Sequence, residues 1–125
     1  MKRTFAAAIF AVLIIAAIPV YAAEMTAKDL QEMCTASDDI SKNECEFYIL
    51  GVAQGADLVS AAAPTKDKDH CISIPEGMNY NAIVLAVKMK MGQDLMVFPA
   101  DLNSPAVSIV AAVLVSTFPC GKKWH

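Results

Sequence analysis

The stretch Ser41–Ser60, SKNECEFYILGVAQGADLVS, predicts the central helix of this chain. Ser41 with Glu44 three residues later forms the pattern of a capping box, in which side chains and backbone amides pair where a helix begins. One apolar stripe recurs at helical spacing, and it consists of Cys45, Tyr48, Ile49, Val52, Ala56 and Val59. Gly51 and Gly55 lie at the edge of that stripe. The other side is also apolar, with Phe47, Leu50 and Leu58, so we expect neighbouring helices on both sides.

The N-terminus has the three parts of a secretory signal peptide. Lys2 and a second basic residue precede the apolar run Phe5–Ile18, and small residues follow where a signal peptidase cleaves. The alternative is a membrane anchor, but the run is shorter than the roughly 20 residues that a spanning helix needs. We expect cleavage after Ala22, which makes 1–22 a signal peptide and 23–125 a single domain in the periplasm.

The charge of the chain argues against a nucleic-acid partner. Cleavage would remove Lys2 and Arg3 but no acid, which changes the net charge from −3 to −5. Binding to nucleic acid requires a basic surface, so that class of function is not expected. No membrane contact is expected once the signal peptide is removed. The acidic surface is compatible with a basic protein partner, and equally with ordinary solubility.

Two further helices are predicted before and after the central one. The first covers Thr26–Met33, with Thr26 as the N-cap and Asp29 in the first turn. The other covers Tyr80–Met91, between the cap Asn79 and Gly92, which is expected to end it.

The last helix is predicted from Pro105 to about Phe118, with Ser104 as its N-cap. It is apolar almost all round and too short to span a membrane. Small residues along one side allow another helix to approach closely, from the same chain or from a second copy. The residues that we assign to helix packing or to a dimer are Tyr48, Gly51, Gly55, Ser108, Ala112 and Ser116.

Four cysteines in a small exported domain predict two disulfides. They allow three pairings, which their spacing alone does not separate. The last two helices are consecutive and are expected to be antiparallel, so Cys71 before one and Cys120 after the other should meet. Cys34 and Cys45 flank the short link between the first two helices and form the other expected pair. The predicted fold is all-α, a small four- to five-helix bundle with two disulfides.

Few residues are suited to catalysis or to metal binding. His70 and His125 are the two histidines, and His70 adjoins Cys71, which is expected to be oxidised. The chain has no C-x-x-C or H-x-x-x-H pattern, so no metal and no other cofactor is predicted. Gly51 and Gly55 lie within a helix, where GxxxG is a packing motif rather than a phosphate loop. These observations favour a protein that is not an enzyme.

Several short patterns occur in a fixed order along the mature chain. They are Cys45-x-x-Tyr48-x-x-Gly51-x-x-x-Gly55, then Cys71-x-x-x-Pro75, Phe98-Pro99, Ala106, Ala111-Ala112 and finally Phe118-Pro119-Cys120. In this order they resemble the Rap/Tai family of periplasmic immunity proteins, over essentially the whole mature chain. The chain differs from the family pattern at Cys71-Ile-Ser-Ile-Pro75, where Cys-x-Pro is usual, and at Asn81, near which a glutamine is common.

The resemblance implies a compact helical protein that is often dimeric. It also implies protection against a type VI secretion effector, typically a peptidoglycan amidase, by occlusion of the active-site cleft of that enzyme. Such inhibition needs a rigid scaffold that presents a loop, and the connectors at 61–70 and 92–103 are the candidates. The partner-binding residues that we select there are Thr65, Lys66, Asp67, Lys68, Asp69, Phe98 and Asp101.

Two other functions are compatible with the composition. A small helical periplasmic chaperone of the acid-stress type would have to open at low pH, which two disulfides oppose. A helical periplasmic interaction protein of unknown ligand is the remaining alternative. The sequence therefore predicts an immunity protein that binds and blocks its effector.

Overall fold

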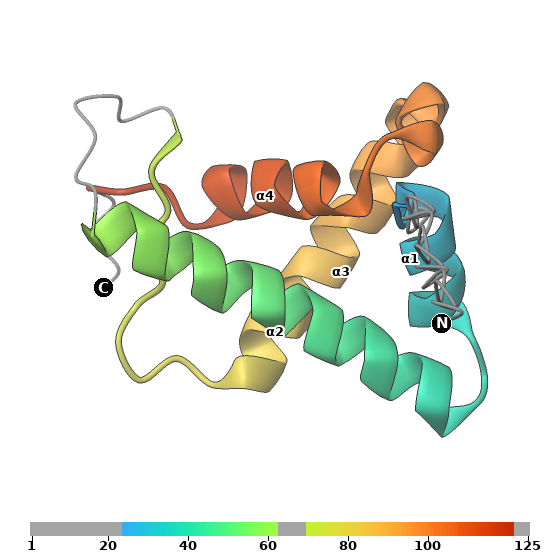
Figure 1. Ribbon diagram of the computed structural model, residues 1–125, viewed down its shortest axis with the longest axis horizontal. Helices are drawn as coiled ribbons and strands as arrows, with labels where there is room; N and C mark the ends of the chain where they lie inside the picture. The colour runs from blue at the N-terminus through green and yellow to red at the C-terminus, as the bar shows by residue number, and fades with distance from the viewer. Residues whose placement is uncertain (1–23, 63–69, 122–125) are drawn as a thin grey trace, which may run out of the picture.

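The computed structural model describes residues 24–62 and 70–121. These residues form the helices α1 (Ala27–Thr35), α2 (Asp39–Ala62), α3 (Tyr80–Val97) and α4 (Ala106–Thr117), with a short 3-10 helix, η2 (Pro99–Asn103), before α4. Within this part of the chain the only β-type pairings are two isolated bridges, Thr26 with Pro105 and Ile72 with Pro119. The predicted all-α bundle is confirmed. Figure 1 shows α3 crossing behind α2 and α4, with α1 beside the start of α2.

One hydrophobic core lies where the four helices meet. Its largest fully buried side chains come from all four, and they are Leu30, Cys45, Ile49, Val87, Met91, Val110, Val113 and Leu114. Each such aliphatic side chain contributes about 1.5–3 kcal/mol when it is fully buried. Packing between helices, rather than helix propensity alone, therefore holds the domain together.

The start of α1 agrees with the sequence. The Thr26 hydroxyl accepts a hydrogen bond from the Asp29 amide (3.2 Å), and the Asp29 carboxylate accepts one from the Thr26 amide (2.9 Å). The hydrogen bonds that the Thr26 amide and hydroxyl donate to the Asp29 carboxylate lower the pKa of Asp29. Backbone hydrogen bonds from Ala27 to Ser104 and from Ala106 to Met25, both 2.8 Å long, join this cap to the start of α4.

The predicted cap of α2 at Ser41 is wrong. Helix α2 begins two residues earlier, at Asp39, and the Asp38 carboxylate accepts a hydrogen bond from the Ser41 amide (2.8 Å). That hydrogen bond lowers the pKa of Asp38. A carboxylate is favoured at a helix N-terminus because it pairs with free amides and with the helix dipole, so Asp38 takes the capping position.

The prediction that α2 has neighbours on both sides holds only in part. The buried residues of α2 are Cys45, Ile49 and Ala53, and α1, α3 and α4 all contact this helix. On its other side Leu50 is half-buried and packs against the core. Phe47 is 74% exposed and Leu58 is 69% exposed, and no helix of the described chain covers these two side chains.

Helix α3 is longer than predicted because Gly92 does not end it. The helix continues to Val97, and Leu95, beyond the glycine, is only 3% exposed. An ion pair between Lys90 and Asp94 also spans Gly92. A glycine inside a helix costs about 1 kcal/mol relative to alanine. Burial of a leucine contributes about 1.5–3 kcal/mol, which outweighs that cost.

The start of α4 is displaced by one residue from the prediction. Pro105 occupies the N-cap position and its carbonyl accepts from the amides of Ser108 (3.1 Å) and Ile109 (3.3 Å). The start of α4 has no side-chain cap, and the carbonyl of Ser104 accepts a hydrogen bond from the amide of Ala27. Backbone pairing with the start of α1 therefore takes the place of a side-chain cap.

Both predicted disulfides are confirmed. Cys34 is bonded to Cys45, with their Cα atoms 5.1 Å apart, and Cys71 is bonded to Cys120, with their Cα atoms 5.4 Å apart. The first bridge joins the end of α1 to the N-terminal part of α2. The second joins the segment after α2 to the residues that follow α4.

The predicted signal peptide at 1–22, the residues Thr65–Asp69 and His125 lie outside the described residues. None of the described helices is long and apolar enough to cross a membrane.

Candidate functional site

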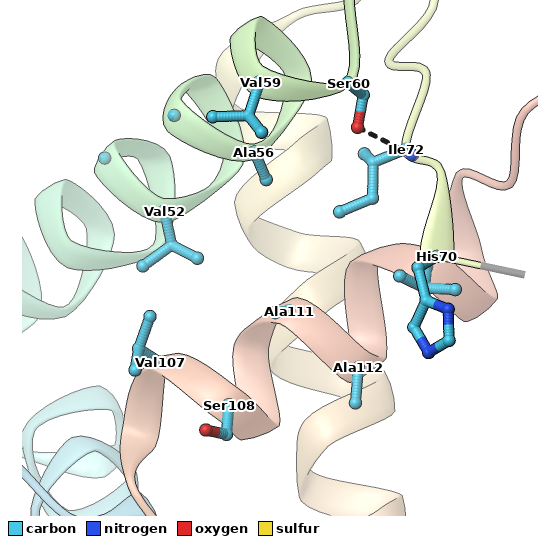
Figure 2. A pocket seen from close by; sticks show the side chains of 13 residues that line it. Val52, Ala56, Val59, Ser60, His70, Ile72, Val107, Ser108, Ala111 and Ala112 are labelled. Carbon is cyan, nitrogen blue, oxygen red and sulfur yellow. Dashed lines mark hydrogen bonds between the residues drawn. The ribbon is translucent and has the colours of Figure 1, made fainter. Parts of the chain in front are cut away.

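An open apolar groove of about 640 Å³ lies between α2 and α4. Its lining residues are Gly51, Val52, Gly55, Ala56, Val59, Ser60, His70, Ile72, Val107, Ser108, Ala111, Ala112 and Val115. None of these is an Asp, Glu, Lys or Arg. Figure 2 shows Val52, Ala56 and Val59 along α2, opposite Val107 and Ala111 of α4, with Ile72 between the two helices at one end.

The α2 wall of the groove is shallow because it contains two glycines. Gly51 and Gly55 are both exposed, and a Cβ atom added to either would meet no described atom within 4 Å. No helix of the described chain therefore packs closely against this pair. Of the two predicted roles, helix packing within the chain and packing against a second copy, only the second has space available at these glycines.

The α4 wall is formed by residues on the side away from the core. Ala106, Val110, Val113 and Leu114 of this helix are buried, whereas Ser108, Ala112 and Ser116 are exposed. The predicted strip of small residues thus faces outward. Ser108 and Ala112 line the groove, while the Ser116 hydroxyl donates to the Val113 carbonyl of its own helix (2.8 Å).

One end of the groove is closed by residues 70–74, which we call the strap. Its inner side is fixed by two side chains from the last turns of α2. The Ile72 amide donates to the Ser60 hydroxyl (3.2 Å), as drawn in Figure 2, and the Ile74 amide donates to the Asp57 carboxylate (3.0 Å). Ile72 is buried and Ile74 is half-buried. These contacts make the strap a fixed wall of the groove.

The outer side of the strap pairs with the residues that follow α4. The Ser73 amide donates to the Phe118 carbonyl (2.9 Å), and the Cys120 amide donates to the Cys71 carbonyl (3.2 Å). The Cys71–Cys120 disulfide crosslinks the same two segments. The strap therefore connects the end of α2 to the end of α4.

A smaller depression of about 320 Å³ lies on the other side of α4. It brings together two residues predicted to bind a partner, Phe98, which is 60% exposed, and Asp101 of η2. The ion pair of Lys90 with Asp94 lies in the same lining, and Ala112 lines both this depression and the groove. The other predicted partner-binding residues, 65–69, lie outside the described residues.

Tyr48 lies apart from both depressions, half-buried and packed against the core. Burial raises the pKa of its hydroxyl, and the negative charge of Glu24 raises it further. Tyr48 therefore stays neutral and acts as a packing residue within the chain. Among the described residues, no cluster of three or more His, Cys, Asp and Glu side chains could hold a metal ion.

The comparison with known families supplies an identification for this scaffold. The family model of the Rap1a immunity proteins matches residues 26–120, from the N-cap of α1 to the cysteine after α4. The chain belongs to the Rap1a immunity protein family. No curated protein and no solved structure was found to match it.

Membership of the Rap1a family confirms the resemblance predicted from the ordered patterns of the sequence. It implies that this Rap1a immunity protein binds a cognate effector, and it points to an inhibitor rather than an enzyme. The apolar groove suits such a role, because protein interfaces have an apolar centre surrounded by polar groups.

Much of the lining of the groove in this Rap1a protein was predicted from the sequence to be covered by neighbouring helices. Val52, Ala56 and Val59 belong to the apolar stripe of α2, yet they line an open groove. No role was predicted from the sequence for Asp57 and Ser60, whose side chains hold the strap. The available signal was their spacing, since two polar residues three apart at the end of an apolar helix can bond to a passing backbone.

Proposed function

We propose that this protein binds and blocks a type VI secretion effector in the periplasm, and that the effector is a peptidoglycan amidase whose active-site cleft it occludes. The observation that carries the proposal is the family match over residues 26–120, which spans all four described helices and both disulfides. The amidase and the occlusion follow the resemblance to the Rap/Tai proteins.

The two disulfides support an oxidising compartment. Disulfides persist in the periplasm and are rare in the cytosol, where thiols are kept reduced. All four cysteines of the chain are paired, and the pattern of a signal peptide precedes the described residues. Both features support a protein that meets its effector in the periplasm.

We assign the effector to the surface on both sides of α4. The groove offers an apolar, uncharged centre, and the depression around Phe98 and Asp101 adds an exposed aromatic ring with charged neighbours. Aromatic residues in such positions often carry much of the binding energy of an interface. The predicted loop residues 65–69 join α2 to the strap in sequence and belong to the same proposal.

We also propose that the exposed face of α2 packs against a second copy of the chain. Gly51 and Gly55, four residues apart, allow a helix to approach closely, and exposed Phe47 and Leu58 lie beside them. Small residues at this spacing are a common feature of close helix contacts. Gly51 and Gly55 also line the groove, so the surface for the second copy borders the surface for the effector along α2.

The test uses a small exported hydrolase with Cys and His catalytic residues, encoded by a gene adjacent to that of this protein. We expect the mature protein to form a complex with it and to suppress its cleavage of purified peptidoglycan. Ala112→Arg, on the ridge between the two depressions, should weaken binding at least tenfold, about 1.4 kcal/mol. Gln93→Arg, an exposed position that lines neither depression, is the matched control.

Isothermal titration calorimetry measures the affinity, and release of peptidoglycan fragments measures inhibition. Equal loss of binding in both arginine variants would place the interface elsewhere on the protein. If the wild-type protein neither binds nor inhibits the hydrolase, the proposed function is contradicted for that pair.

A further inference from the structure

The two disulfides differ in how far solvent reaches them. Cys45 is completely buried and Cys34 is 9% exposed, at the packed junction of α1 and α2. Cys71 and Cys120 are both partly exposed. Since thiol–disulfide exchange requires access of a thiolate to a sulfur atom, a reductant in solution meets the second bridge first.

We propose that the Cys71–Cys120 disulfide is a redox-sensitive lock on the groove. Reduction of this bond releases the strap and opens that end of the groove, while the four helices stay packed. The consequence for effector binding rests on the proposed function, whereas the opening itself concerns this chain alone.

The strap has little buried apolar surface of its own once the bond is broken. Its inner side has the hydrogen bonds to Ser60 and Asp57, and its outer side has the two backbone hydrogen bonds to residues 118–120. Ile72 is its one buried side chain. Segments with few buried apolar contacts open locally at a fraction of the global unfolding free energy.

The helices do not depend on the strap for their packing. All buried residues of α1, α2, α3 and α4 belong to the same core cluster, to which the strap contributes Ile72, with half-buried Ile74 packed against it. The contacts of α1 with α2, of α2 with α4 and of α3 with α4 are all direct. The buried Cys34–Cys45 bond retains its own crosslink between α1 and α2.

The chemistry of the lock is thiol–disulfide exchange with a dithiol. One thiolate of the dithiol attacks an exposed sulfur and forms a mixed disulfide, and its second thiolate then displaces the protein sulfur. Two electrons and two protons pass to the protein, so that Cys71 and Cys120 become thiols and the reductant becomes a disulfide. Exchange with an oxidant disulfide reverses the reaction. The groove is then complete only in an oxidising compartment.

The first experiment treats the oxidised mature protein with graded dithiothreitol, a dithiol, and alkylates the free thiols with iodoacetamide. Peptide mapping should find Cys71 and Cys120 alkylated at reductant concentrations that leave Cys34 and Cys45 bonded. Far-UV circular dichroism should keep its helical signal at that stage. Earlier alkylation of Cys34 and Cys45, or loss of helix together with the first reduction, would overturn the proposal.

The second experiment compares two double variants by hydrogen–deuterium exchange. In Cys71→Ser/Cys120→Ser the amides of Ile72 and Ile74 should exchange at least about tenfold faster, with core amides such as that of Val110 little changed. In the control Cys34→Ser/Cys45→Ser, the exchange rates of the strap amides should keep the ratio to those of the core amides that they have in the wild type. Unchanged strap protection in the first variant, or its global unfolding, counts against the lock.

Binding of the hydrolase is measured separately on the same variants. We expect Cys71→Ser/Cys120→Ser to lose affinity at least tenfold while it remains helical. Full affinity with an open strap would refute the functional half of the proposal. If the wild-type protein forms no complex, the proposed function fails, and the alkylation and exchange results still decide whether the lock exists.

Discussion

A disulfide lies near each end of α2, but one end of this helix is packed and the other is open. At the N-terminal end Cys45 and Ile49 are fully buried, and a buried bridge connects this end to α1. Beyond Ala53 no residue of α2 is buried, and this end forms one wall of the groove. The partly exposed bridge there fixes the strap rather than a helix.

The comparison separates two uses of a crosslink in a small domain. At the packed end the disulfide adds to contacts that already exclude water, so its contribution is to stability. At the open end it holds a wall that has little burial of its own, so its contribution is to the shape of a surface. The chain-entropy model assigns about 3 kcal/mol to the shorter loop and about 4 kcal/mol to the longer one.

The largest expected effect comes from a truncation at the packed end. Ile49→Ala should lower the free energy of unfolding by about 2–5 kcal/mol, because it leaves a cavity in the core. Leu58→Ala, at the exposed outer face of the open end, should change it by less than about 0.5 kcal/mol. Urea unfolding with both disulfides intact measures the difference. Similar losses in the two variants would show that the open end is packed as well.

A smaller effect is expected from the cap of the packed end. The pKa of Asp38 is lowered in the folded protein by the hydrogen bond from Ser41, so its ordinary unfolded value is the higher of the two. Its contribution to stability is complete above the unfolded pKa and disappears as the pH falls through the folded pKa. The pKa of Asp29, in the cap of α1, is also lowered, so its contribution to stability depends on pH in the same direction.

Asp38→Asn should therefore reduce the loss of stability on acidification, measured by thermal unfolding from pH 6 to pH 2.5. Glu44→Gln, which removes the partner of the cap that the sequence indicated at Ser41, is the control and should lower the stability at pH 6 less than Asp38→Asn does. A larger loss of stability in Glu44→Gln would instead support Ser41 as the cap of α2.

The smallest effect on stability is expected at the open end itself. Gly51→Leu should leave the free energy of unfolding of the monomer unchanged or slightly higher, because the position is exposed, a Cβ atom there meets no other part of the described chain within 4 Å, and leucine favours a helix more than glycine does. It should abolish the proposed dimer, because a leucine separates two helices that approach at a glycine. Light scattering after size-exclusion chromatography reports the mass.

Gly51→Ala serves as the milder control, with a weaker effect on the dimer. A destabilised Gly51→Leu monomer would mean that a part of the chain packs on this face of α2. A wild-type protein that is monomeric at all concentrations would refute the dimer and leave the fold unaffected.

Capping signals agreed with the structure at Thr26 but not at Ser41 or Ser104. Thr26 and Asp29 form the predicted box, whereas the neighbouring carboxylate of Asp38 takes the place of Ser41 at the start of α2. Gly92 is a helix stop by propensity, and burial of Leu95 outweighed it. Local rules therefore failed where a neighbouring residue offered a better cap, as at Asp38, or where a tertiary contact was worth more than the local preference, as at Leu95.

The sequence by itself determined the approximate positions of the helices and the family, because both depend on residue types and their spacing along the chain. The two disulfide pairs followed from the expected antiparallel arrangement of those helices. Only the tertiary structure decided which apolar residues are core. Ile49 and Val59 lie on the same predicted stripe, yet one is buried and the other is 65% exposed. Periodicity reports which side chains share a face of a helix. Whether that face is covered depends on where the other helices lie, and at the C-terminal end of α2 the strap and α4 leave a groove.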